Sequence, residues 1–185
     1  MADIISQAYN FATNHYYIVG SIAALIIGRI WFAGSMTPNK QDLKGKIVIV
    51  TGCNSGIGID TAKTLAAQGA TLIMANRNKA KTDPILQSIK AETKNDNIEF
   101  MQIDLSNIES IQKFANEFKA KYKKLDILIH NGGIFLNKTE NSAQGIENTF
   151  MTNYCSNYLL TNLLLDCLKA AKEAKVILVS SEAAQ

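Results

Sequence analysis

The chain has 185 residues and a mass of 20.3 kDa, with 47% hydrophobic and 19% charged residues. It is long enough for one folded core but short of two. The net charge is +3 and the basic residues are spread along the chain, which argues against a nucleic-acid-binding surface. Three widely spaced cysteines without a C-x-x-C pair argue against a disulfide scaffold and a metal site, and favour a reducing compartment.

An apolar stretch, YYIVGSIAALIIGRIWFA, runs from Tyr16 to Ala33 and carries one charge, Arg29. Such a helix would be about 27 Å long, which predicts a narrow transmembrane anchor at residues 16–34 and contact with membrane lipid. Residues 1–15 form a separate N-terminal segment with Asp3 but without Lys or Arg before the stretch, unlike a secretory or mitochondrial presequence. The alternatives are a buried helix or a cleaved signal peptide.

Positive charge follows the apolar stretch, at Arg29, Lys40, Lys44 and Lys46. This bias predicts that the rest of the chain lies on the cytoplasmic or mitochondrial matrix side, at the endoplasmic reticulum or the inner mitochondrial membrane. Residues 35–45 are expected to form a polar linker before the folded domain at residues 46–185.

Apolar runs and helical patterns alternate along that domain. Strands are predicted at residues 46–51, 71–75, 98–103, 125–129 and 176–180. The first two helices between them are predicted at residues 57–68 and from a cap at Asp83 to about residue 93. The third is predicted from a capping box of Ser106 and Glu109 to about residue 122. The fourth is predicted to begin at about Ile146 and to run for about two dozen residues. This order predicts an α/β fold, a doubly wound parallel sheet that binds ligands beyond the carboxyl ends of its strands.

The strongest chemical signal is the segment Thr51-Gly-Cys-Asn-Ser-Gly-Ile-Gly58, at the junction of the first predicted strand and helix. Its three glycines allow a tight turn and a close approach of the backbone to a diphosphate. The helix that follows offers unpaired N–H groups and the positive end of its dipole. The spacing differs from G-x-G-x-x-G and from the Lys-terminated nucleotide loop. The segment predicts a dinucleotide site.

The second predicted strand is followed by Ala75-Asn-Arg-Asn78, which contains no acid. In such folds a carboxylate here holds a ribose hydroxyl, whereas a guanidinium pairs with a 2′-phosphate. Arg77 therefore favours NADP over NAD. The alternative is that Arg77 is a solvated loop residue.

These motifs resemble the short-chain dehydrogenase/reductase (SDR) family, and within it the membrane-anchored, retinol-dehydrogenase-like members. The resemblance covers about residues 43–185 and implies a Rossmann-like domain preceded by an N-terminal transmembrane helix. The segment from Thr51 to Gly58 is similar to the cofactor loop of the family, and Asp104-Leu105 to its adenine-contacting position. His130-Asn-Gly-Gly133 lies where the family has Asn-Asn-Ala-Gly, and differs at the first and third residues.

Asn153 is similar to the catalytic Asn of the family, and Ser181 to the serine that hydrogen-bonds the reacting carbonyl or hydroxyl. The alternative is that Asn153 is an ordinary polar residue of a helix and Ser181 an ordinary turn residue at the end of a strand. The cofactor residues expected from the loop, the strand ends and the resemblance are Thr51, Gly52, Asn54, Ser55, Gly56, Ile57, Gly58, Arg77, Asp104, Leu105, Asn131 and Gly132.

The resemblance leaves out the Tyr-x-x-x-Lys pair, because only four residues follow Ser181. The fifth predicted strand would also keep one free edge, which invites pairing with another polypeptide. Two hypotheses follow. The first is a membrane-anchored, NADP-preferring oxidoreductase that moves hydride between the nicotinamide and a lipophilic alcohol or carbonyl, with the base supplied elsewhere. The second is a catalytically silent accessory subunit of a membrane protein complex.

Overall fold

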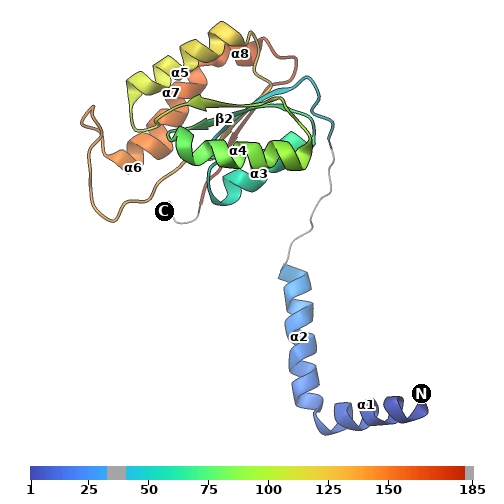
Figure 1. Ribbon diagram of the computed structural model, residues 1–185. Helices are drawn as coiled ribbons and strands as arrows, with labels where there is room; N and C mark the ends of the chain where they lie inside the picture. Colours follow the sequence, from blue (N-terminus) through green and yellow to red (C-terminus); the bar gives the residue numbers. More distant parts are fainter. Residues whose placement is uncertain (33–40, 182–185) are drawn as a thin grey trace. The chain divides into compact units, whose positions relative to one another are not determined.

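The computed structural model describes residues 1–32 and 41–181. The chain divides into two compact units, Met1–Lys40 and Gln41–Gln185. The first unit contains helices α1 (Ala2–Asn14) and α2 (Tyr16–Phe32). The second contains a sheet with its covering helices (Figure 1).

Helix α2 corrects the prediction of a transmembrane anchor at residues 16–34. The described part of this helix has 17 residues and is about 26 Å long at a rise of 1.5 Å per residue. Among residues 1–32 and 41–181, none of the helices has both the length and the apolar character to cross a bilayer. The predicted transmembrane helix is therefore wrong. Residues 33 and 34, and the first part of the predicted linker, lie outside the described residues.

The sheet of the second unit has five parallel strands in the order β3-β2-β1-β4-β5. Their bounds are β1 Ile47–Thr51, β2 Thr71–Asn76, β3 Ile98–Gln102, β4 Ile127–His130 and β5 Lys175–Leu178. The predicted doubly wound parallel sheet is confirmed. The order reverses between β1 and β4, and the carboxyl ends of these two strands border the crevice where such sheets bind ligands.

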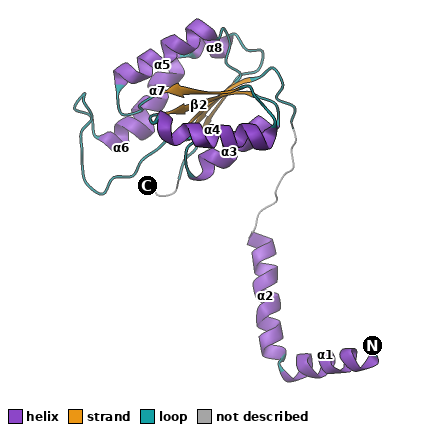
Figure 2. Cartoon of the chain, viewed as in Figure 1, coloured by secondary structure: helices purple, strands orange, loops and turns teal. Residues whose placement is uncertain are grey.

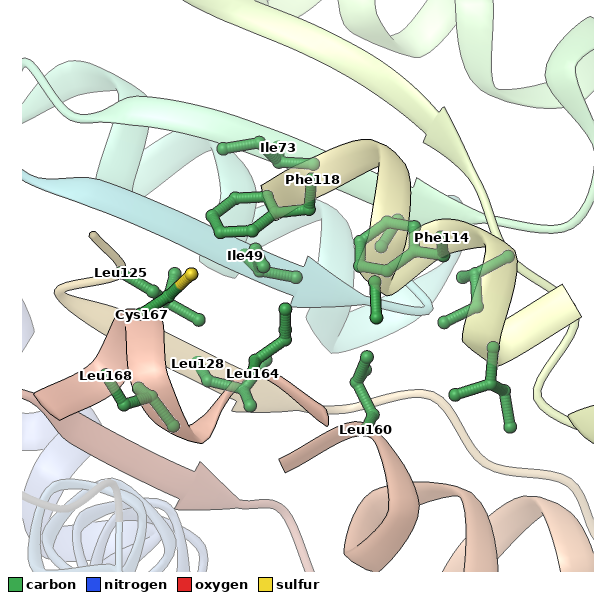
Figure 3. Packing of buried hydrophobic residues seen from close by; sticks show 14 of the residues in the cluster. Ile49, Ile73, Phe114, Phe118, Leu125, Leu128, Leu160, Leu164, Cys167 and Leu168 are labelled. Atoms are coloured by element: carbon green, nitrogen blue, oxygen red, sulfur yellow. The ribbon is translucent and has the colours of Figure 1, made fainter. Parts of the chain in front are cut away.

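Helices cover both faces of the sheet (Figures 1 and 2). Alternate residues of β1 determine which helices pack where, since successive side chains of a strand point to opposite faces. Val48 and Val50 pack in one cluster with residues of α3 (Gly56–Ala67) and α4 (Lys79–Thr93). Ile49 packs in the other with residues of α5 (Ile108–Lys121), α7 (Ser156–Leu163) and α8 (Leu165–Lys169). Figure 3 shows Phe118 of α5 beside Ile49 in this second cluster.

Two helices begin at different caps from those predicted. Asn78 caps α4, and its side chain accepts a hydrogen bond from the Lys81 N–H at 3.0 Å, so the expected start at Asp83 is wrong and Pro84 lies inside the helix. Asn107, not Ser106, caps α5. The hydroxyl of Ser106 instead donates to Asp104 at 2.7 Å. In both cases several residues able to cap lie close together, and the local pattern does not rank them.

The long helix predicted from Ile146 is divided. It contains α6 (Asn148–Phe150), a π-helical turn η1 (Met151–Cys155), α7 and α8, with a break at Leu164. Strand β5 follows, and its residues are exposed; Leu178 is 62% exposed. The π-helical turn has a wider hydrogen-bonding pattern than an α-helix and changes which side chains face the sheet.

Candidate functional site

The carboxyl end of β1 passes directly into α3 through the glycine-containing loop. Ser55 is the N-cap of α3 but makes no side-chain capping hydrogen bond, and the helix begins at Gly56 and Ile57. The first N–H groups of a helix have no intrahelical partner, and the helix dipole adds positive potential there. Because the cap side chain leaves these donors open, this end of α3 can bind a diphosphate through the backbone.

Glycines bring the ends of β1 and β4 into close contact. A Cβ atom on Gly58 would lie 2.3 Å from the carbonyl oxygen of Gly52 and 2.6 Å from Nδ2 of Asn131. A Cβ atom on Gly132 would lie 2.7 Å from Cδ1 of Leu105. Position 58 therefore excludes a side chain, whereas at position 132 the Leu105 side chain would have to move. Gly56 has open space around its Cβ position, and its φ of +50° is the reason for glycine there.

Thr51 and Asn131 join the two strand ends by hydrogen bonds. The hydroxyl oxygen of Thr51 accepts from the N–H of Asn131 at 3.1 Å and from the N–H of Gly132 at 2.9 Å. The Asn131 side chain donates to the carbonyl oxygens of Thr51 and Gly52, at 3.1 and 2.9 Å. These contacts fix the backbone on both sides of the crevice.

The ends of β2 and β3 carry opposite charges. One guanidinium nitrogen of Arg77 lies 3.9 Å from a carboxylate oxygen of Asp104, and Arg77 is 75% exposed. The other Asp104 oxygen accepts from the N–H and the hydroxyl of Ser106. Asp104 is thus held in place, whereas Arg77 is free to turn toward an anion, since an exposed pair at this distance is weak.

These elements border a cavity of about 480 Å³. The predicted residues that line it are Gly52, Asn54, Arg77, Asp104, Leu105 and Gly132. Seven further polar residues of the lining were not among the predicted site residues: Asn76, Asn78, Lys81, Ser106, Glu140, Asn148 and Thr152. The spacing of four residues between Arg77 and Lys81 could have predicted Lys81, because it places two positive charges near the start of the same helix. No local pattern pointed to Asn148 or Thr152.

The two predicted catalytic residues lie outside this lining. Asn153, within the π-helical turn, accepts from the N–H of Ile134 at 2.9 Å and donates to the carbonyl oxygen of Ile134 at 2.8 Å. Its side chain therefore holds the loop after β4. Ser181 is exposed and lies beyond the end of β5.

Two titratable side chains near the strand ends are held neutral by burial. Burial raises the pKa of Cys53 to about 11, so its thiol is not a nucleophile although it belongs to the glycine loop. Burial lowers the pKa of His130 to about 4. One ring nitrogen of His130 is 2.8 Å from the hydroxyl of Thr161, so this histidine joins the end of β4 to α7.

The fold and the site define a dinucleotide-binding α/β protein. The glycines that a Cβ atom would block, the open amides at the start of α3 and the cations after β2 all fit a phosphorylated dinucleotide. The family model described as short chain dehydrogenase matches residues 46–185. The chain belongs to this family.

Two curated relatives and one solved structure illustrate the similarity. Retinol dehydrogenase 12 from Bos taurus is 37% identical over 99% of this chain and 56% of its own length. Polyprenol dehydrogenase from Homo sapiens is 38% identical over 92% of this chain and 53% of its own. A short chain dehydrogenase from Escherichia coli CFT073, solved in complex with NADPH, is 29% identical, with a TM-score of 0.68 over 78% of this chain and 62% of its own. The chain thus spans about half the length of these curated relatives.

Proposed function

We propose that the whole protein is an NADP-preferring oxidoreductase that transfers hydride between the nicotinamide and a lipophilic alcohol or carbonyl compound. The observation that carries the proposal is the combination of Arg77 and Lys81 at the cavity with the open amides of the glycine loop. The relative solved with NADPH supports the cofactor. The names of two relatives, which specify retinol and polyprenol, support a lipophilic alcohol as substrate.

Each part of the cofactor has a chemically matched group in this chain. The amides at the start of α3 bind the diphosphate, and Arg77 with Lys81 binds the 2′-phosphate. Asp104 accepts a hydrogen bond from the adenine. When bound, the nicotinamide supplies or receives the hydride, and Asn153 and Ser181 serve the reacting centre.

The cofactor preference can be tested by calorimetric titration of the purified chain with NADPH and with NADH. Arg77→Ala should weaken NADPH binding roughly tenfold or more, since a charged hydrogen bond contributes about 1.5–3 kcal/mol, and leave NADH binding unchanged. Arg29→Ala removes the same charge from an exposed position in the first unit and is the matched control. Tighter binding of NADH, unaffected by Arg77→Ala, would contradict the preference.

A second candidate function is that of a catalytically silent accessory subunit. The observation that favours it is the exposed strand β5, where Val176, Ile177 and Leu178 offer an apolar edge to another polypeptide. This hypothesis predicts dinucleotide binding without turnover in the native complex, and loss of the partner in native mass spectrometry with Ile177→Lys. Turnover of a lipophilic alcohol by the native complex would exclude it.

We also propose that the first unit contacts a lipid surface. Large apolar side chains of α2 are exposed, among them Ile22, Leu25 and Ile26, and the retinol and polyprenol dehydrogenase relatives act on lipophilic alcohols by name. Leu25→Lys with Ile26→Lys should reduce flotation of the chain with phosphatidylcholine vesicles. Val176→Lys, which lies in the second unit, is the control. Equal flotation of all three proteins would contradict lipid contact through α2.

A further inference from the structure

Lysines that are spread along the sequence meet at one edge of the sheet, at the amino ends of β1, β4 and β5. The segments that lead into these strands are residues 41–46, 119–126 and 169–175. They contain nine of the seventeen lysines of the chain and only three carboxylates. Their excess of six positive charges is larger than the net charge of the whole chain, which is +3. These three segments are called the lysine edge.

Hydrogen bonds place the three segments side by side. The N–H of Asp126 donates to the carbonyl oxygen of Ile47 at 3.0 Å, and the N–H of Lys175 to the carbonyl oxygen of Asp126 at 2.9 Å. Nζ of Lys124 donates to the carbonyl oxygen of Gly45 at 3.0 Å. The lysine edge is therefore one continuous surface, although its segments are far apart in the sequence.

Little of this positive charge is neutralised within the second unit. The buried carboxylate of Asp126 pairs with both Lys46 and Lys124, at 3.1 and 3.0 Å, so two cations share one negative charge. Lys121 pairs with Glu99 of β3. Within residues 41–181 the other lysines of the edge form no ion pair, and most of them are exposed: Lys44, Lys123, Lys169, Lys172 and Lys175. Like charges held close together repel one another, so an anionic partner would stabilise this surface.

The helix dipole accounts for only part of the clustering. Lys119 and Lys121 lie in the last turn of α5, where cations complement the partial negative charge of the helix end. Lys44, Lys172 and Lys175 lie outside the helices. Their charge is available to a partner outside the chain.

The residue types and the course of the chain indicate what this partner is. The lysine edge has no arginine, the residue that binds a single phosphate in bidentate fashion and most often reads a base of DNA. Lysine is instead a flexible point charge, which suits a surface of mobile anions. The edge is also the part of the sheet that follows α2 in the sequence, because Lys46 directly precedes β1. Lysine clusters that follow a lipid-contacting segment attract anionic headgroups.

We infer that the lysine edge binds the anionic headgroups of a lipid surface. The choice of a lipid rests on the proposed contact of α2 with lipid, and the dinucleotide site is not involved. The cavity lies at the carboxyl ends of the strands, whereas the lysine edge lies at their amino ends. Binding through the lysine edge thus leaves the cavity open to a water-soluble cofactor.

The test is titration of the full chain with vesicles of phosphatidylcholine, with and without phosphatidylserine, followed by flotation. Wild type should bind vesicles with about one third phosphatidylserine roughly a hundredfold more tightly, because each lysine near an anionic surface strengthens binding about fivefold. Roughly 0.5 M salt should abolish this gain, since the Debye length then falls to about 4 Å.

A matched pair of double variants assigns the gain to the lysine edge. Lys172→Gln with Lys175→Gln should reduce it roughly tenfold or more and leave binding to pure phosphatidylcholine unchanged. Lys113→Gln with Lys138→Gln removes the same charge from exposed positions outside the edge and should keep the gain. Equal Tm values of the two double variants would show that both are folded alike.

The remaining outcomes separate this inference from the lipid contact of α2. Equal wild-type binding to both kinds of vesicle would overturn the inference, as would a gain that Lys172→Gln with Lys175→Gln keeps in full. Binding of duplex DNA as tightly as of anionic vesicles, at the same salt concentration, would assign the lysine edge to nucleic acid and also overturn it. Binding to anionic but not to neutral vesicles would support the lysine edge and refute the contact through α2. Binding to neither would refute both.

Discussion

The Cα atom of Gly132 lies 2.5 Å from the position that a Cβ atom on Gly52 would occupy. The two glycines follow β1 and β4, which are neighbours in the sheet although they are far apart in the sequence. Contact of backbone with backbone at this point leaves space above the strand ends for a dinucleotide. Even the methyl group of an alanine at position 52 would therefore disturb the site.

Gly52→Ala should destabilise the fold and abolish NADPH binding. The residue has a φ of +67°, which costs about 1–2 kcal/mol for a residue with a Cβ atom, and the clash with Gly132 adds to this strain. Gly45→Ala is the matched control, because Gly45 has a φ of +74° but open space around its Cβ position. Thermal unfolding and NADPH titration of both variants check the prediction. Equal losses in the two variants would show that the contact with Gly132 is unimportant.

Thr51→Val should loosen the connection between the two strand ends. The substitution keeps the shape of this fully buried side chain but leaves the N–H groups of Asn131 and Gly132 without their acceptor. We expect a loss of about 2 kcal/mol in the free energy of unfolding, with an unchanged m value in urea, and weaker NADPH binding. Thr51→Ser retains the hydroxyl and should behave nearly as wild type. A Val variant as stable as wild type would contradict the role of this hydroxyl.

Stability should fall between pH 6.5 and pH 4 because of His130. Burial lowers its pKa in the folded protein to about 4, whereas an unfolded histidine has a pKa of about 6.5. The unfolded chain therefore binds a proton in this window that the folded chain does not, so stability is complete above pH 6.5 and decreases as the pH falls. At about 1.36 kcal/mol per pH unit, the loss is on the order of 3 kcal/mol at pH 4.

Urea unfolding at several pH values measures this loss in wild type and in two variants. His130→Asn should flatten the pH dependence of the free energy of unfolding in this window. His15→Asn replaces the exposed histidine of the first unit and should leave the dependence as in wild type. The same slope in His130→Asn and wild type would assign the pH dependence to other groups.

Cys53 should resist alkylation in the folded protein despite its place in the cofactor loop. Its pKa of about 11 leaves almost no thiolate at pH 8, and its thiol lies against the Val50 carbonyl oxygen at 3.3 Å in the core. Iodoacetamide labelling followed by mass spectrometry should modify Cys155, which is half-buried, before Cys53. Urea should expose Cys53 to rapid labelling. Rapid labelling of Cys53 in the native chain would contradict the burial of its thiol.

Several features followed from the sequence alone. The alternation of apolar strands and helical patterns predicted the five parallel strands, because period-2 and period-3.6 patterns depend on neighbouring residues. The glycines at 52, 56 and 58 were identified for the same reason, since a positive φ and a close backbone approach leave few alternatives to glycine. Arg77 was located because the residues that follow the second strand of such a sheet lie near the ribose of the cofactor, whereas Asp104 was identified from the resemblance to the family.

Other features depended on the tertiary structure. Which residue caps α4 or α5 is decided by competition between nearby residues that are able to cap. The π-helical turn and the meeting of Lys81, Asn148 and Thr152 in one cavity arise from packing between segments far apart in the chain. A local pattern records the conformation of a segment. It does not record which distant side chains that conformation brings together, because packing of the whole sheet and its helices sets those distances.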